Sequence, residues 1–274
     1  MDRRLTPANG RVAAAELKDQ VSAERFVAGT WKAVARPVAD LLDAPGGRRD
    51  RQLLYGETFR VLEEHDGHAF GQARRDGYVG YLSSADLKPV IDCTHFVVSP
   101  ATHAYPAPDI KVHETMALPF GARFRVVSAS GPFFETEEGL FVPKPHLRPL
   151  NAAMRDPATV AQLFFGAPYL WGGNSTRGID CSGLVQAAHL ACHIDCPGDS
   201  DLQRAALGTD LPQGTSPRRG DLFFWQGHVA IAVDADVLLH ANVHRMAVTY
   251  EPITDAVARI LAQGDGPVTA HKRL

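Results

Sequence analysis

Residues 169–186 read YLWGGNSTRGIDCSGLVQ, and this stretch decides how the C-terminal part of the chain is organised. A glycine-rich polar loop leads into Asp180-Cys181-Ser182-Gly183, and the stretch that follows, LVQAAHLACHI, has apolar residues at helical spacing. The pattern predicts that Cys181 lies at a helix N-terminus. There the helix dipole and the free N–H groups favour the thiolate, which is the nucleophilic form of cysteine.

A histidine downstream is the candidate base for this thiol. Residues 218–233 read RRGDLFFWQGHVAIAV, which predicts two adjacent strands around a Gln226-Gly227 turn, with His228 first in the second strand. His240 follows in DVLLHANV, the expected next strand. A cysteine at a helix N-terminus, a histidine on a facing strand and a polar residue on the neighbouring strand form the constellation of papain-like enzymes. Here the third group is an imidazole, which would hold the His228 ring in its useful tautomer.

The composition changes near residue 150, where a separate domain is expected to begin. The segment PLNAAMRDPATVAQLFFGAPYLWGG predicts a helix with Asp156 as its N-cap and Pro157 at its first position. We therefore expect a third domain over residues 151–274, which is long enough to bury its own core.

An internal repeat organises the region before this domain. Residues 55–62 read YGETFRVL and residues 120–127 read FGARFRVV, and both show the alternation of a half-buried strand. The two repeats end alike, in GYVGYLSSADLKP and GLFVPKPHLRP. Two small β-barrels are expected, and the pattern resembles bacterial SH3-like domains. The expected fold is therefore α+β, with a lead-in segment over residues 1–20 that forms a helix or frays, and with barrels over 21–90 and 91–150.

Composition excludes several classes of protein. The chain has a formal charge of -3, so no basic excess favours a nucleic-acid partner. The apolar runs are far shorter than the ~20 residues that a membrane helix needs, and the basic N-terminus has no apolar stretch of a secretory signal behind it. A cytoplasmic protein is expected. Four cysteines are too few for a disulfide scaffold, which leaves room for a catalytic thiol: Cys93, Cys181, Cys192 and Cys196.

Taken together, these motifs resemble the NlpC-type family of papain-like cysteine peptidases, which cleave bacterial cell-wall peptides. The matching pieces, in order, are YLWGG, DCSGL, RRGDLFFW, GHVAIAV and HAN. The resemblance implies Cys181 as the nucleophile, His228 as the general base and His240 as the residue that orients it. It also implies that Tyr169 lines the oxyanion hole beside the backbone N–H of Cys181.

Tandem SH3-like domains before such a domain resemble a narrower subgroup, the γ-D-glutamyl-L-diamino acid endopeptidases of the dipeptidyl-peptidase VI type. Its members hydrolyse the γ-D-glutamyl–diamino acid bond of murein peptides such as L-Ala-γ-D-Glu-diaminopimelate, releasing L-Ala-D-Glu for cell-wall recycling. They require a free N-terminal L-Ala, whose ammonium would form charge-assisted hydrogen bonds with carboxylates.

The subgroup's substrate-binding residues have counterparts in this sequence. The resemblance implies that Glu57 and Tyr78 of the first barrel bind the ammonium, and that Asp199 and Ser200 contact the peptide. Beside the nucleophile, Ser182 is a further candidate for substrate contact. Asp180 is another, although it could instead pin the loop through Arg177.

Three alternatives remain open. His189, Cys192, His193 and Cys196 have helical spacing and ligand types that suit zinc, but Pro197-Gly198 is expected to end the helix before the set is complete. No metal, cofactor or obligate protein partner is therefore expected. The second alternative is an exported endopeptidase or amidase acting on the wall. The third is a non-catalytic module that binds wall peptides, which the intact set of Cys181, His228 and His240 disfavours.

Overall fold

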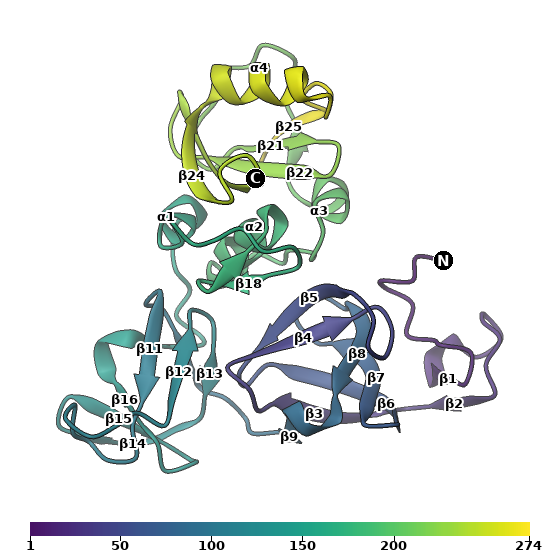
Figure 1. Cartoon of the computed structure of the whole chain (residues 1–274), viewed down its shortest axis with the longest axis vertical. Helices are drawn as coiled ribbons and strands as arrows, with labels where there is room; N and C mark the ends of the chain where they lie inside the picture. Colours follow the sequence, from purple (N-terminus) through teal and green to yellow (C-terminus); the bar gives the residue numbers. More distant parts are fainter. The chain divides into compact units, whose positions relative to one another are not determined.

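The computed structural model describes all residues from 1 to 274, and the chain divides into two compact units (Figure 1). The first unit comprises residues 1–151 and the second comprises residues 152–274. No helix in either unit has the length and apolar character needed to cross a membrane.

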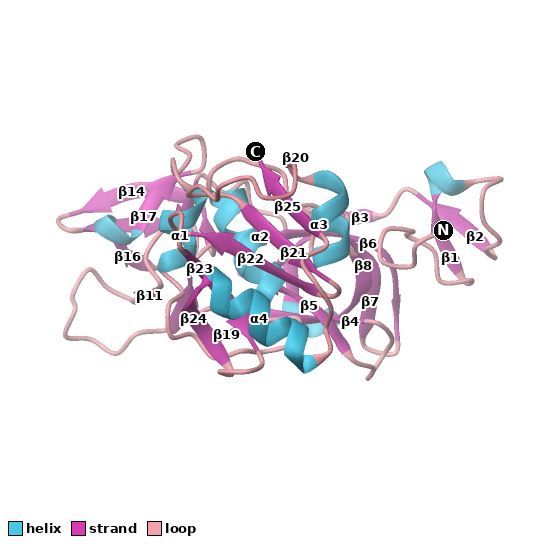
Figure 2. Ribbon diagram, turned by 90° about the horizontal axis from the view of Figure 1, so that it is seen from above, coloured by secondary structure: helices cyan, strands magenta, loops and turns pink.

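A seven-stranded antiparallel sheet forms the first barrel of unit 1 (Figure 2). Its strand order is β5-β4-β8-β7-β6-β3-β9, and side chains alternate between its two faces, so that Leu41, Phe59 and Leu82 are fully buried. The strands are β3 (Thr30–Val34), β4 (Val38–Leu42), β5 (Arg49–Leu54), β6 (Thr58–His65), β7 (His68–Ala73), β8 (Val79–Ser83) and β9 (Leu87–Pro89).

The lead-in segment neither frays nor forms the expected α-helix. Strand β1 (Val12–Ala14) pairs in parallel with β2 (Arg25–Val27), and a single 3₁₀ turn, η1 (Ala15–Leu17), follows β1. The side chains of β1 are completely buried and pack in a cluster with Leu62 and Phe70 of the first barrel. Burial of this apolar run against the barrel decides its conformation, which helix propensity alone does not.

The second barrel consists of three small sheets, and it ends like the first. A 3₁₀ turn precedes the last strand in both: η2 (Ser84–Asp86) before β9, and η3 (Lys144–His146) before β17. In both, the last strand pairs with the first, which confirms the internal repeat. The strands are β10 (His95–Val97), β11 (Ala101–Ala104), β12 (Met116–Pro119), β13 (Arg123–Phe124), β14 (Val126–Ser130), β15 (Phe133–Thr136), β16 (Phe141–Pro143) and β17 (Leu147–Pro149).

The two barrels of unit 1 meet at the repeated aromatic-glycine pair. The ring of Tyr55 is buried in the core of the second barrel, 5.2 Å from the ring of Phe124, and its carbonyl accepts a 2.8 Å hydrogen bond from Arg123 N. Gly56 has a φ of +78°, and a Cβ there would lie 2.3 Å from the carbonyl oxygen of Arg123. Only glycine fits this approach, so the repeat motif also joins the barrels.

Unit 2 is an antiparallel six-stranded sheet with helices packed against it. The strand order is β20-β25-β21-β22-β23-β24; α1 and α2 pack against β22, whereas α4 packs against β23 and β24, away from α1 and α2 (Figure 1). The fold is α+β, as expected. The strands are β18 (Asn174–Ser175), β19 (Gly178–Ile179), β20 (Thr209–Asp210), β21 (Leu222–Trp225), β22 (His228–Ala232), β23 (Val237–Asn242), β24 (Ala247–Pro252) and β25 (Ala270–Arg273). The helices are α1 (Pro157–Gln162), α2 (Cys181–Ala191), α3 (Ser200–Ala206) and α4 (Ile253–Gln263).

Candidate active site

Helix α2 begins at Cys181, as the sequence predicts, because Asp180 caps it. Asp180 Oδ1 accepts a 2.6 Å hydrogen bond from Gly183 N, and Oδ2 accepts a 2.8 Å bond from Gly172 N. One carboxylate thus caps the helix and holds the preceding loop. It binds the loop through the backbone N–H of Gly172, whereas the sequence suggested Arg177 as the partner. Cys181 is 6% exposed and occupies the first helical position, where the dipole favours its thiolate.

The side chain of Ser182 is also hydrogen-bonded within the domain. Its hydroxyl donates to Asp180 Oδ1 at 3.1 Å, and its carbonyl accepts a 2.8 Å bond from Gln203 Nε2. Asp180 and Ser182 are both buried. Asp180 and Ser182 thus have a structural role around the nucleophile, and their contact with substrate stays a prediction.

His228 begins β22, directly after the predicted two-residue turn. Trp225 and His228 pair across the hairpin, and Gly227 has the positive φ, +72°, that the turn requires. This confirms the predicted pair of strands. Since α2 packs against β22, the helix that starts at Cys181 is fixed against the strand that starts at His228.

A hydrogen-bonded chain runs from His228 to His240 and on to a carboxylate. His228 Nε2 lies 2.9 Å from His240 Nδ1, and His240 Nε2 lies 3.0 Å from Glu251 Oε2. The side chain of His240 is completely buried. The register explains the contact: His240 pairs with Thr249 across β23 and β24, so Glu251 is its diagonal neighbour on the same face.

Arg259 of α4 holds Glu251 from the other side. Its Nε donates to Glu251 Oε1 at 2.8 Å and its Nη2 donates to Oε2 at 2.7 Å, an arrangement of two parallel bonds. Arg259 first, and then His240, keep the pKa of Glu251 far below its usual range, so the group is a carboxylate. Neither Glu251 nor Arg259 is predicted from the sequence. The signal for Glu251 is the hairpin register, which places residue 251 diagonal to His240.

Burial is the largest of the causes that lower the pKa of His228 to about 3. The imidazole is therefore neutral at neutral pH and can accept a proton. A thiolate formed next to the ring would favour its protonated form, since opposite charges stabilise each other.

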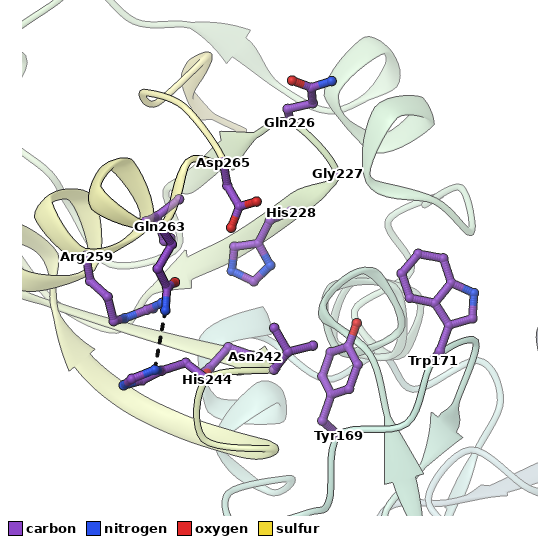
Figure 3. A pocket seen from close by; sticks show the side chains of 12 residues that line it. Tyr169, Trp171, Gln226, Gly227, His228, Asn242, His244, Arg259, Gln263 and Asp265 are labelled. Carbon is purple, nitrogen blue, oxygen red and sulfur yellow. Dashed lines mark hydrogen bonds between the residues drawn. The ribbon is translucent and has the colours of Figure 1, made fainter.

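A cavity of about 190 Å³ opens beside His228 (Figure 3). Figure 3 shows the ring of His228 turned into it, with Tyr169 and Asp265 on either side. Tyr169 bridges to Ile179, next to Asp180, so the wall of the cavity is connected to the residues that precede Cys181. This position of Tyr169 at the site is compatible with the expected contribution to an oxyanion hole, which stays a prediction.

Asp199 and Ser200 lie where α3 begins, and Asp199 is its N-cap residue. Both are partly exposed. Gln203 of α3 donates to the carbonyls of Ser182 and Pro197, which ties this segment to the first turn of α2. The segment therefore adjoins the helix end that carries Cys181, and its contact with a peptide stays a prediction.

Glu57 and Tyr78 belong to the first barrel of unit 1, and both are buried. Glu57 Oε2 accepts from Leu54 N at 2.8 Å and pairs with Arg75 Nη1 at 2.9 Å, whereas Oε1 has no partner within the protein. The contact of Glu57 with a substrate ammonium stays a prediction. The ring of Tyr78 belongs to the barrel core, and its contact with substrate stays a prediction.

The candidate zinc set of the sequence does not assemble. Helix α2 ends at Ala191, and His193 has a positive φ of +58°, so the four side chains do not share a helical face. No group of three or more His, Cys, Asp or Glu side chains is placed to hold a metal ion. His189 is buried and its Nδ1 donates to the carbonyl of Val185 at 2.7 Å.

Comparison with protein families identifies both parts of the chain. The model of the NlpC/P60 family matches residues 166–259. Unit 2 is an NlpC/P60 domain. The model of the bacterial dipeptidyl-peptidase SH3 domain matches residues 41–87, within the first barrel. NlpC/P60 is a family of cysteine peptidases, so the expected class of domain is confirmed.

Three of the relatives are named dipeptidyl-peptidases. Dipeptidyl-peptidase 6 of Lysinibacillus sphaericus is 37% identical over 34% of each chain. The γ-D-glutamyl-L-lysine dipeptidyl-peptidase of Bacillus cereus is 23% identical over 76% of this chain and 60% of its own length. The protein of the same name from Bacillus subtilis is 26% identical over 75% and 76%. The chain thus spans a third to three quarters of the length of these relatives.

A solved NlpC/P60 family protein from Bacillus cereus has the same fold as this chain. The match has a TM-score of 0.74 at 18% identity, and it covers 89% of this chain and 99% of the other.

Proposed function

We propose that this protein is a cell-wall peptidase that hydrolyses the γ-D-glutamyl–diamino acid bond of murein peptides and releases L-Ala-D-Glu. The hydrogen-bonded chain from His228 through His240 to Glu251 carries the proposal, because it provides an oriented base in a domain whose helix N-terminus holds a cysteine. The names of the relatives support the choice of bond.

The proposed chemistry is acyl transfer to sulfur. His228 takes the proton of Cys181, the thiolate attacks the γ-carbonyl carbon, and backbone N–H of Cys181 stabilises the oxyanion. His228 then protonates the leaving amine, and water hydrolyses the acyl-enzyme. The exposed carboxylate of Asp265, at the cavity beside His228, suits the second amino group of a leaving diamino acid.

The proposed substrate carries a free N-terminal L-Ala. In intact murein this nitrogen is acylated, so the substrate is a peptide already cut from the glycan. We therefore propose a role in the recycling of wall peptides, in the cytoplasm.

The products of one peptide test the choice of bond. Incubated with L-Ala-γ-D-Glu-diaminopimelate, the protein is expected to yield L-Ala-D-Glu and free diaminopimelate, identified by mass. A product pair of L-Ala and γ-D-Glu-diaminopimelate would show that a different bond is cut and would contradict the proposal.

The free oxygen of Glu57 leads to a second prediction. Glu57→Gln is expected to raise KM for the free peptide by about 10-fold or more, because the ammonium loses a charge-assisted partner. Glutamine suits this test better than alanine, since it can still accept the bonds from Arg75 and from Leu54 N.

The matched control is Glu63→Gln in the same barrel, where a buried carboxylate binds Arg11 and Arg25. It should lower the thermal stability and leave KM unchanged. An equal KM for Glu57→Gln and the wild type would remove Glu57 from the substrate site.

A further inference from the structure

The hydrogen bonds around His240 have a direction as well as a length. We propose that Glu251, held by Arg259, fixes the tautomers of both histidines and thereby leaves Nδ1 of His228 as the bare nitrogen that serves as the base. Glu251 and Arg259 are positioning residues in this proposal. It rests on the proposed function only in that the base serves Cys181.

The direction follows from the donors and acceptors. Glu251 is a carboxylate and can only accept, so His240 Nε2 must carry the proton of their 3.0 Å hydrogen bond. In the proposal His240 is neutral and has one N–H, so its Nδ1 is bare and accepts from His228 Nε2 at 2.9 Å. The single proton of neutral His228 is then on Nε2, and its Nδ1 is free to accept the thiol proton.

The imidazole at position 240 is what makes Glu251 necessary. An amide oxygen in its place would accept from His228 Nε2 without help, because an oxygen has no alternative tautomer. An imidazole can carry its proton on either nitrogen. With the proton on His240 Nδ1, His228 Nε2 would have to accept, and the proton of His228 would move to Nδ1 and block the base.

Arg259 keeps Glu251 in the state that this direction requires. The two hydrogen bonds to Glu251 hold the carboxylate in place, and the third nitrogen, Nη1, donates to Gln263 Oε1 at 2.8 Å. The positive charge also opposes protonation of Glu251. The carboxylate therefore stays an acceptor when His228 becomes protonated during the reaction.

The same domain contains a matched cluster outside the site. Asp221 accepts from Arg273 through both oxygens at 2.6 Å and lies 2.8 Å from His271 Nε2. The His271 ring stacks on Phe223, and no hydrogen bond links it to His228. Asp221→Asn therefore disturbs a carboxylate–histidine–arginine cluster of the same composition. It leaves the hydrogen-bonded chain from His228 to Glu251 intact.

The wild-type protein provides the first test, without any substrate. In ¹⁵N spectra of histidine-labelled protein at neutral pH, we expect His240 to be protonated on Nε2 alone and His228 on Nε2 alone, with assignments from His240→Asn and His228→Ala. A spectrum with the proton on Nδ1 of either ring would overturn the proposal, whatever peptide the enzyme cleaves.

The second test is a double-mutant cycle, read out both as kcat and as the rate at which iodoacetamide alkylates Cys181. Glu251→Gln places an NH₂ group where one carboxylate oxygen was, so the amide cannot accept from His240 and from both Arg259 donors. We expect kcat and the alkylation rate to fall about 10- to 100-fold, with KM within about twofold.

In the His240→Asn background, the same substitution should change both rates by no more than about twofold, since the amide at 240 needs no direction from Glu251. Asp221→Asn should lower the thermal stability with both rates within about twofold of the wild type. The proposal would be overturned if Glu251→Gln lowered kcat and the alkylation rate equally in both backgrounds, or if Asp221→Asn lowered them as much as Glu251→Gln. Glu251 would then have only a structural role. Because alkylation is measured without a peptide, its rate tests the role of Glu251 even if the proposed substrate is wrong.

Discussion

Replacement of Cys181 by alanine is expected to lower kcat by on the order of 10⁵-fold or more while the protein stays folded. The helix does not depend on the sulfur, because Asp180 caps α2 through Gly183 N and the loop through Gly172 N. The thiol is the only nucleophile proposed for the reaction, so no partial activity should remain. The measurement is the release of diaminopimelate, with circular dichroism as the check of folding.

Iodoacetamide provides the companion measurement on the wild type. Burial raises the pKa of the Cys93 thiol, and burial together with Asp156 raises that of Cys192 to about 11, so both are poor nucleophiles at neutral pH. Cys181 should therefore be alkylated first, as read by peptide mass mapping. Faster labelling of another cysteine, or an active alanine variant, would remove Cys181 from the mechanism.

His228→Ala is expected to cause a loss of similar size, because no other group is placed to move the proton between Cys181 and the leaving amine. Burial lowers the pKa of His228 in the free enzyme. The base is active when it is neutral, so its rate declines as the pH falls through that pKa. The acid limb of kcat/KM should accordingly lie below pH 6.5, the ordinary value for histidine.

His271→Ala is the matched control, because this histidine lies in the same sheet, binds the carboxylate of Asp221 and stacks on Phe223, and has no part in the proposed mechanism. It should leave kcat unchanged. A His228→Ala variant with kcat within tenfold of the wild type would contradict the assignment of the base.

The parts of the fold that could be predicted carry their signals close together in the sequence. The caps at Asp156 and Asp180 and the turn at Gln226-Gly227 each involve contacts over two or three residues, and the structure confirms the elements that they start or join. The two barrels follow from internal similarity, which needs no knowledge of distant contacts.

What could not be predicted depends on partners far away in the chain. The lead-in strand forms because residues 12–14 are buried against the first barrel. Glu57 is bound by Arg75, 18 positions away, and Asp180 by Gly172, so residues chosen as substrate contacts have structural partners. Glu251 reaches His240 only through the register of β23 and β24, and Arg259 only through the return of α4 onto this sheet.

The preference for a free amine distinguishes a peptidase of released wall peptides from one that acts on intact wall. The measurement is kcat/KM for L-Ala-γ-D-Glu-diaminopimelate against the same peptide with an N-acetyl cap. An acylated nitrogen carries no charge and loses its charge-assisted bond to the buried carboxylate, at about 2 to 5 kcal/mol, so the capped peptide should react ~30-fold to several-thousand-fold more slowly. Equal kcat/KM values for the two peptides would contradict the account and favour an endopeptidase that acts on intact wall.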